Sequence, residues 1–267
     1  MSDSDLQSQI AAAKAYEEFF VPALFGEWAT RVAAIAQIQT GHHVLDVACG
    51  TGVLAREAVS RVGPSGVVAG LDPSPGMLAV AAQCAPRIEW RDGTAEALPY
   101  PDERFDAVVS QFGLMFFTDR RRALHEMHRV LKRGGHLAVA VWASLDRAPA
   151  YAAEVALVER LAGKRAADAL RAPFVLGDPK DLAQLVASAS VAEATIMTQP
   201  GVARFPSIRF MVEADLRGWL PLMGVVLTED QIQRILQEAE HALGAYVTAA
   251  GTMAFELAAH LLSSAKS

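Results

Sequence analysis

Short β-rich runs alternate with helical stretches between Val44 and about Trp142, and this alternation constrains the fold more than any other feature of the chain. Two of the runs are nearly continuous apolar segments, as expected for strands that are covered by helices on both faces. Strand and helix in repetition predict a doubly wound α/β sheet. The candidate strands are Val44–Ala48, Val67–Leu71, Ile88–Trp90, Phe105–Ser110 and Leu137–Trp142, and the helical patterns between them cover Leu54–Val62, Gly76–Gln83 and Arg121–Lys132.

The flanking sequence predicts helical cover over the sheet and not a second independent domain. Residues 5–38 form an Ala-rich helical lead-in that we expect to be interrupted at Pro22. After the last candidate strand come helical patterns at 148–162 and 179–187, a β-like stretch at 191–198, a helical block at 207–246 and an alternating apolar ending within 252–263.

Composition excludes several classes of protein. The 267 residues are 52% hydrophobic and 20% charged, which excludes intrinsic disorder. Lys and Arg total 24 against 30 Asp and Glu, and the net charge of −6 argues against a nucleic-acid partner. Two cysteines are too few for a disulfide framework or a thiolate zinc site. Short apolar runs and a polar, acidic start predict no membrane span, no secretory signal and a cytoplasmic location.

The segment from Val44 to Gly52 predicts a ligand-binding turn at the end of the first strand. Gly50 and Gly52 allow positive φ and let a ligand approach the backbone without a Cβ collision. The exposed N–H groups at the start of the next helix then face that ligand. Asp72 ends the second strand, 20 residues beyond Gly52, where a carboxylate can accept both hydroxyls of a ribose.

Two cofactors compete for this turn. Residues 50–55 fit the G-x-G-x-x-G/A fingerprint of dinucleotide-binding proteins, which predicts an NAD(P)-dependent oxidoreductase. Three features favour S-adenosylmethionine: Asp46 inside the first strand, the segment 91–100 after the third strand, and the Gly134-Gly135 turn into the fifth. In a third interpretation the turn binds no ligand and only lets the helix and strand pack. Asp72 and the Thr94-Ala95 segment, in register with the turn, argue against this interpretation.

Together these segments resemble the class I S-adenosylmethionine-dependent methyltransferases, with the closest likeness to the group of the ubiquinone and menaquinone C-methyltransferases. The resemblance covers about residues 40–145 and rests on four separated motifs in the right order. It implies a Rossmann-like, seven-stranded mixed sheet with the cofactor across the carboxyl ends of the early strands. With the flanking helices, we expect a single domain over 1–267: an N-terminal helical lid at 1–40, a cofactor-binding core at 41–145 and a helical insertion over the substrate site at 206–247.

The resemblance also implies the contacts of the cofactor. Cys49 and Arg133 depart from the family's pattern, but the glycines beside them remain. The implied contacts are Tyr16 in the lid; Ala48, Gly50, Thr51 and Gly52 around the methionine moiety; Asp72 at the ribose; Pro73 and Met77 beside the adenine; Gly93, Thr94 and Ala95, next to Asp92, in the adenine turn; and Gln111 past the fourth strand.

The expected reaction is methyl transfer from S-adenosylmethionine to a small, apolar or aromatic molecule, with S-adenosylhomocysteine as product. Such a displacement needs alignment and exclusion of water, and a carbon or alcohol acceptor needs a base as well. We nominate no catalytic base and no metal ligand, because the histidines at 125 and 128 fit a solvated helix face. Candidate pocket residues are Phe112, Met115, Phe116, Phe117, Trp142, Phe210, Met211, Trp219, Leu220 and Met223.

Two alternatives to a methyltransferase stay open at this point. One is the NAD(P)-dependent oxidoreductase, and the other is a non-catalytic cofactor-binding module that regulates a partner. The late helices could also form a dimer interface, so the sequence leaves a homodimer open.

Overall fold

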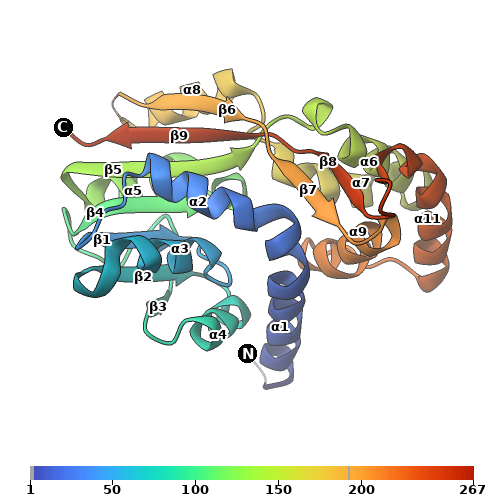
Figure 1. Ribbon diagram of the computed structural model, residues 1–267, viewed down its shortest axis with the longest axis horizontal. Coiled ribbons are helices and arrows are strands. Elements are labelled where there is room, and N and C mark those ends of the chain that lie inside the picture. The colour runs from blue at the N-terminus through green and yellow to red at the C-terminus, as the bar shows by residue number, and fades with distance from the viewer. Residues whose placement is uncertain (1–2, 192) are drawn as a thin grey trace.

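A seven-stranded sheet forms the centre of the molecule in this computed structural model, which describes residues 3–191 and 193–267 (Figure 1). Met1 and Ser2 of the predicted lid and Ala192 of the predicted β-like stretch lie outside the described residues. In spatial order the strands are β3 (Glu89–Asp92), β2 (Val67–Asp72), β1 (His43–Val47), β4 (Phe105–Gln111), β5 (Leu131–Trp142), β9 (Ala259–Ala265) and β6 (Thr195–Gln199).

The sheet is mixed and doubly wound, as the sequence predicts. The strands from β3 to β5 in this order are parallel, and β9 runs antiparallel to both β5 and β6. The chain steps from β1 toward β2 in one direction and from β4 toward β5 in the other. Since such crossovers are right-handed, the helices they contain cover opposite faces of the sheet. The strand order therefore reverses between β1 and β4, which is where ligands bind in open α/β sheets.

The helices of the core follow the predicted pattern with small shifts of their ends. Helix α5 was predicted to reach Lys132 but ends at Val130, because Leu131 and Lys132 already belong to β5. Strand β1 ends one residue before the prediction, because Ala48 turns to a φ of 57°. The core helices are α2 (Gly26–Ile35), α3 (Val53–Val62), η2 (Gly63–Ser65), α4 (Pro75–Cys84), η3 (Leu114–Phe116), α5 (Arg120–Val130) and α8 (Pro179–Ser188).

The N-terminal segment stays helical through Pro22, so the predicted interruption there is wrong. Helix α1 (Asp3–Ala15) continues into a π-helix, η1 (Tyr16–Phe25), which leads into α2. The N–H of Gly26 donates to the carbonyl of Val21, the i to i−5 bond of a π-helix. In Figure 1 this segment descends past the carboxyl ends of the parallel strands, with α1 beside α4.

A helical cover lies beyond the same ends of the strands (Figure 1). The sequence predicts most of it, but not α7 or the two-stranded sheet of β7 and β8. Its elements are η4 (Leu145–Arg147), α6 (Pro149–Ala162), α7 (Lys164–Arg171), η5 (Ala172–Phe174), β7 (Val202–Phe205), α9 (Ile208–Ala214), η6 (Asp215–Trp219, a second π-helix), α10 (Leu220–Leu222), α11 (Glu229–Ala242), η7 (Gly244–Tyr246) and β8 (Met253–Glu256).

Candidate active site

Parallel pairing brings the predicted cofactor segments to one edge of the sheet. Strands β1, β2, β3 and β4 are neighbours and run in the same direction, so the loops that follow them share an edge. The glycine turn, Asp72, the adenine turn and Gln111 are therefore adjacent in space. The lid and the cover lie beyond this edge.

The turn after β1 is built on three residues with left-handed backbone. The φ angles are 57° at Ala48, 54° at Gly50 and 86° at Gly52, and the N–H of Gly52 donates to the carbonyl of Cys49 at 2.8 Å. A positive φ strains a residue with a side chain, and such strain is common at functional sites. A Cβ at Gly113 would lie 2.7 Å from the Cβ of Ala48, so glycine lets the loop after β4 approach this turn.

The carboxylate of Asp72 joins the ends of β1 and β2. One oxygen accepts the N–H of Gly50 and the other accepts the N–H of Ser74, both at 2.9 Å. Burial raises the pKa of Asp72, while these two N–H groups lower it. Each oxygen has a second lone pair, so the carboxylate can still accept hydroxyl groups from a ligand.

The indole of Trp90 on β3 is a neighbour of the glycine turn that the sequence analysis missed. A Cβ at Gly52 would lie 2.4 Å from this ring, and one at Gly70 would lie 2.3 Å from it. The two glycines thus make room for a tryptophan that covers the start of α3. The sequence signal for this contact was Gly70 in the middle of β2, because a glycine inside a strand often marks the close approach of another group.

The N-terminal segment contacts the turn directly. The ring of Tyr16 would lie 4.0 Å from a Cβ at Gly50 and stacks on Phe25 at 5.3 Å between ring centroids. Arg56 donates to the carbonyl of Thr51 at 2.7 Å and to Glu17 at 2.6 Å, and so connects the lid to the turn. Burial and the charge of Asp72 raise the pKa of Tyr16, which keeps its hydroxyl protonated.

Several buried polar atoms at this edge have no protein partner. Thr51 Oγ1 and Gln111 Oε1 find no hydrogen-bond partner among the described residues, although Gln111 Nε2 donates to the carbonyl of Phe25 at 3.1 Å. The carboxyl of Asp46 is buried, and within residues 3–191 and 193–267 it has no ion pair. Burial raises its pKa, and the charge of Asp72 adds to this. These groups suit a ligand with an ammonium group and hydroxyls, as a nucleoside-linked amino acid has.

The remaining predicted contacts lie around the ends of β2 and β3. Ser74 caps α4 by accepting the N–H of Met77, and Pro73 beside it is exposed. The N–H of Gly93 donates to the carbonyl of Asp72 at 3.4 Å, so the adenine turn continues the edge of the sheet. Ala95 is buried there and Thr94 is exposed. The structure thus brings the predicted contacts to one edge of the sheet.

Aromatic side chains from the core and the lid form a continuous cluster at the ends of β4 and β5. Phe112 stacks on Trp142 with centroids 3.7 Å apart, and Phe25 contacts both rings. Phe112 has a φ of 56°, an unusual value for a bulky residue. Trp28 packs edge-on against the same pair. Of the predicted pocket residues, Phe112 and Trp142 lie here, while Met115, Met211 and Leu220 are buried in the core.

The cover meets the lid and the core along a second aromatic seam. Phe19 packs edge-on against Phe210 at 5.0 Å, and Phe116 contacts Trp219 at 5.4 Å between centroids. A Cβ at Gly218 would lie 3.6 Å from Phe20, so the two π-helices touch. The predicted roof residues Phe210 and Trp219 therefore face the lid and η3.

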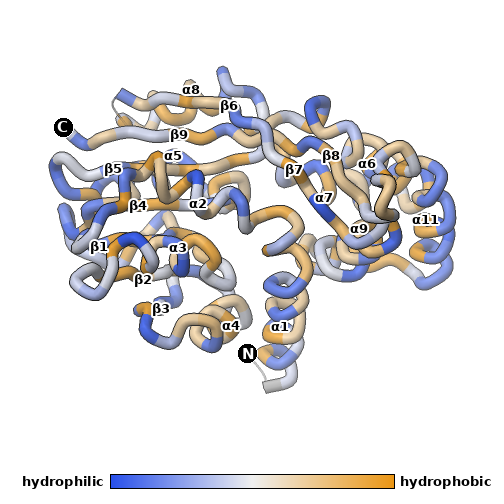
Figure 2. The backbone as a smooth tube through the Cα atoms, viewed as in Figure 1, coloured by the Kyte–Doolittle hydropathy of each residue, from blue (hydrophilic) through white to orange (hydrophobic). Residues whose placement is uncertain are grey.

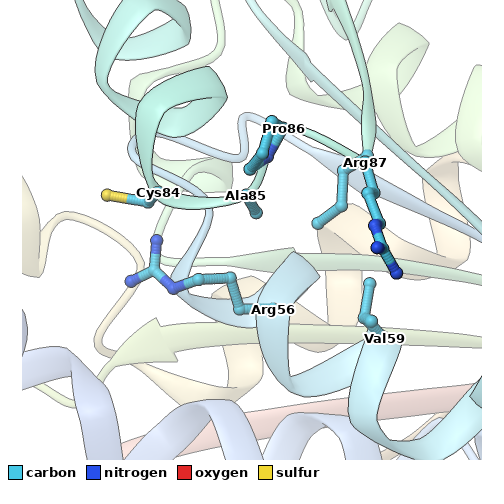
Figure 3. Close-up of a pocket in the computed structure, with 7 residues that line it drawn as sticks. Arg56, Val59, Cys84, Ala85, Pro86 and Arg87 are labelled. Atoms are coloured by element: carbon cyan, nitrogen blue, oxygen red, sulfur yellow. The ribbon is translucent and has the colours of Figure 1, made fainter.

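A surface cavity of about 280 Å³ lies at the amino end of β3 and not at this edge (Figure 3). The side chains of Arg56 and Cys84 lie at one end of it, with Val59 and Arg87 at the other. The cavity lies between α3 and the segment that precedes β3, and not at the carboxyl ends of the strands.

The described residues contain no group of three or more His, Cys, Asp and Glu side chains that could hold a metal ion. His260 is buried, with Nε2 donating to the carbonyl of Gly177 at 2.9 Å and Nδ1 accepting from Thr198 at 2.8 Å. It is a structural residue of the sheet, away from the glycine turn.

The sheet order, the glycine turn and the acidic residue that ends β2 are the arrangement of the class I methyltransferase fold. Residues 45–139 match the family model of the methyltransferase domain. The chain is similar to 2-phytyl-1,4-beta-naphthoquinone methyltransferase of Arabidopsis thaliana, with 41% identity over 120 residues, 42% of this chain and 46% of that protein. It is 39% identical over 118 residues to the ubiquinone/menaquinone biosynthesis C-methyltransferase of Pseudoalteromonas translucida, covering 42% of this chain and 47% of that one.

These matches span about half the length of the curated relatives, and solved structures extend the likeness in fold. The YcgJ protein of Bacillus subtilis has a TM-score of 0.58 at 22% identity and covers 90% of this chain and 98% of that one. A phosphoethanolamine N-methyltransferase of Haemonchus contortus has a TM-score of 0.60 at 16% identity, over 96% of this chain and 57% of that one. Identities this low establish the fold alone.

Proposed function

We propose that this protein is an S-adenosylmethionine-dependent methyltransferase that acts on a small, apolar or aromatic molecule. The observation that carries the proposal is the pair of hydrogen bonds from Gly50 and Ser74 to Asp72, which fixes a buried carboxylate beside the glycine turn. The bound cofactor supplies an activated methyl group on a sulfonium. The protein then has to hold the cofactor and the acceptor in line and exclude water.

The chain's own residues can perform these tasks. Asp72 accepts the ribose hydroxyls, and the buried carboxyl of Asp46 lies in β1 below the turn that receives the methionine ammonium. Gln111 Oε1 and Thr51 Oγ1 offer further polar contacts. Tyr16 and Phe25 exclude water from above, because their rings stack over the turn.

The aromatic cluster supports an apolar acceptor. Phe25, Phe112 and Trp142 form a packed aromatic cluster at the ends of β4 and β5. Such linings suit hydrophobic and aromatic ligands. The relatives named above act on quinones, so a reduced quinone ring is the first acceptor to test. We further propose that residues 1–40 act as the lid, 41–145 as the cofactor-binding core and 206–247 as the cover of the acceptor site. A homodimer and a cytoplasmic location are also part of the proposal.

Thermal unfolding with added ligands tests the cofactor. We expect S-adenosylhomocysteine at about 100 times its dissociation constant to add roughly 2.7 kcal/mol of stability, a rise of several degrees in Tm. NADH at the same concentration should leave Tm unchanged. A rise with NADH alone would support the oxidoreductase instead. Product mass spectrometry with S-adenosylmethionine and a reduced naphthoquinone then separates an enzyme from a non-catalytic module.

The contact between Glu17 and Arg56 should slow release of the cofactor. We expect Glu17→Gln to raise the rate of S-adenosylhomocysteine dissociation about fivefold, since a partly exposed ion pair contributes up to about 1 kcal/mol. Stopped-flow fluorescence measures this rate, with Tyr16 and Trp90 near the site as reporters. Glu18→Gln is the matched control, because Glu18 is the exposed neighbour. Equal rates in the wild type and Glu17→Gln would show that this pair does not hold the lid.

A further inference from the structure

The loop between α10 and α11 presents apolar side chains to solvent. Residues 221–227 read Pro-Leu-Met-Gly-Val-Val-Leu and contain no charge. Val226 is 83% exposed, the highest fraction among the large hydrophobic side chains of the described residues, and Leu222 is 53% exposed. Figure 2 marks hydrophobic residues in the helical cover as well as in the sheet.

A hydrogen-bonded turn holds the exposed side chains of this loop on the outer side. The N–H groups of Met223 and Val225 both donate to the carbonyl of Leu220, at 3.0 and 2.9 Å. Val225 points into the core and is 8% exposed, which fixes its neighbour Val226 on the outer side. The apolar tip is therefore held outward by the fold.

The tip is part of a larger apolar surface at the seam of the site. Trp219, three residues before Leu222, contacts the exposed ring of Phe116 at 5.4 Å. Val175, which is 52% exposed, follows η5, and η5 packs against η3. Large apolar side chains exposed on the loop and on elements near it mark an interaction site.

Basic side chains flank this surface. Arg165 donates to the carbonyl of Gly224 at 2.8 Å, so its guanidinium lies at the tip. Arg120, Arg121 and Arg122 begin α5 four to six residues after Phe116. Arg121 and Arg165 are exposed and make no ion pair among the described residues, while the nearby Glu96 and Asp119 accept backbone N–H groups. Of the two acidic residues that begin α11 after the loop, Glu229 pairs with Arg217 and Asp230 is exposed.

We propose that this surface docks on an anionic lipid bilayer, with Leu222 and Val226 inserted among the acyl chains and Arg165 at the headgroups. Apolar insertion combined with basic residues is the chemistry of interfacial membrane binding. None of the described helices is long and apolar enough to cross a membrane. This inference rests on the apolar acceptor proposed above. Docking here would place the aromatic seam between cover and lid next to the membrane in which such an acceptor dissolves.

Sedimentation with vesicles tests the proposal without any turnover. We expect the wild-type protein to bind phosphatidylglycerol vesicles and to bind phosphatidylcholine vesicles much more weakly, with binding that weakens as salt rises. Val226→Asp and Leu222→Asp should each lower the partition coefficient at least about tenfold. Arg165→Gln should reduce the preference for the anionic lipid.

Val59→Asp is the matched control, because Val59 is a valine on α3 with 42% exposure and lies away from this loop. Its binding should equal that of the wild type, and unchanged Tm values would exclude misfolding. The proposal is wrong if wild-type protein stays in solution with both vesicles or if Val226→Asp binds as well as the wild type. A dimer seen by light scattering, and lost in Val226→Asp, would assign the surface to a second copy of the chain instead.

Discussion

Replacing Asp72 by alanine should lower the affinity for S-adenosylhomocysteine at least about 100-fold, because two ribose hydroxyls lose a charged acceptor worth roughly 1.5–3 kcal/mol each. The structure adds a second cause. The same carboxylate accepts the N–H groups of Gly50 and Ser74, so alanine leaves both loop ends without their partner. Isothermal titration calorimetry measures the affinity directly.

Asp72→Asn separates these causes. The amide has one oxygen, and its NH2 group would face either the N–H of Gly50 or that of Ser74, so one loop contact is lost. We expect an affinity between those of the wild type and Asp72→Ala.

Asp106→Ala is the matched control for a general loss of stability. Asp106 also accepts two hydrogen bonds, from the N–H of His43 and from Lys132, both at 2.8 Å, but it lies at the amino end of β4. This variant should unfold at a lower temperature and bind S-adenosylhomocysteine like the wild type. An unchanged affinity in Asp72→Ala would place the ribose elsewhere.

The cofactor edge was predictable from sequence because its signals are local. A glycine turn after an apolar strand, and an acidic residue at the end of the next strand, each occupy a few adjacent positions. The parallel pairing of the strands alone then places these positions at one edge of the sheet. The placement of Gly50, Gly52 and Asp72 at one edge needed only that the first two strands be parallel neighbours, and β1 and β2 are.

The parts that the sequence did not predict depend on contacts between distant residues. Trp90 of β3 packs on Gly70 of β2 and on Gly52 in the turn after β1. The sequence shows only a glycine inside a strand. The π-helix η1 was misread as a break at Pro22, because proline usually ends or kinks an α-helix, whereas the wider turn with i to i−5 bonding continues the helix past it. Strand β7 was missed because its partner β8 lies some fifty residues further along.

A buried pair of carboxyls in the cover is another such long-range contact. Glu154 of α6 is fully buried, and its carboxyl interacts electrostatically with that of Asp215, the first residue of η6. Within the described part of the chain neither has an ion pair. Burial raises the pKa of Asp215 to about 7, and burial together with the charge of Asp215 holds the pKa of Glu154 well above its usual range. Burial therefore favours the protonated, uncharged form of both carboxyls.

This pair should make the fold less stable as pH rises. Below pH about 4 both carboxyls are protonated in the folded and the unfolded chain. Between pH 4 and 7 the unfolded chain releases these protons first, so it binds fewer protons than the folded chain and the free energy of unfolding falls. The loss for Asp215 is on the order of 4 kcal/mol by pH 8, and ionisation of Glu154 adds to it at higher pH.

The double variant Glu154→Gln, Asp215→Asn should abolish this loss, because the two amides have nearly the same shape as the carboxyls and carry no titrating proton. We expect it to match the wild type near pH 4 and to exceed it in urea unfolding at pH 8 by a few kcal/mol. The difference between the two proteins is the quantity to compare, since His128 and His136, whose pKa values burial lowers, give a slope of the opposite sign.

Glu159→Gln is the control, because Glu159 lies on the same helix but is exposed and pairs with Arg171. It should follow the pH profile of the wild type. Parallel profiles for the wild type and the double variant would show that the two carboxyls are solvated or neutralised in solution. A difference that grows from pH 5 to pH 8 would instead show that the two buried carboxyls hold their protons more tightly in the folded chain. Because η6 contacts the N-terminal segment through Gly218 and Phe20, ionisation of Asp215 would then also weaken the packing of the cover on that segment.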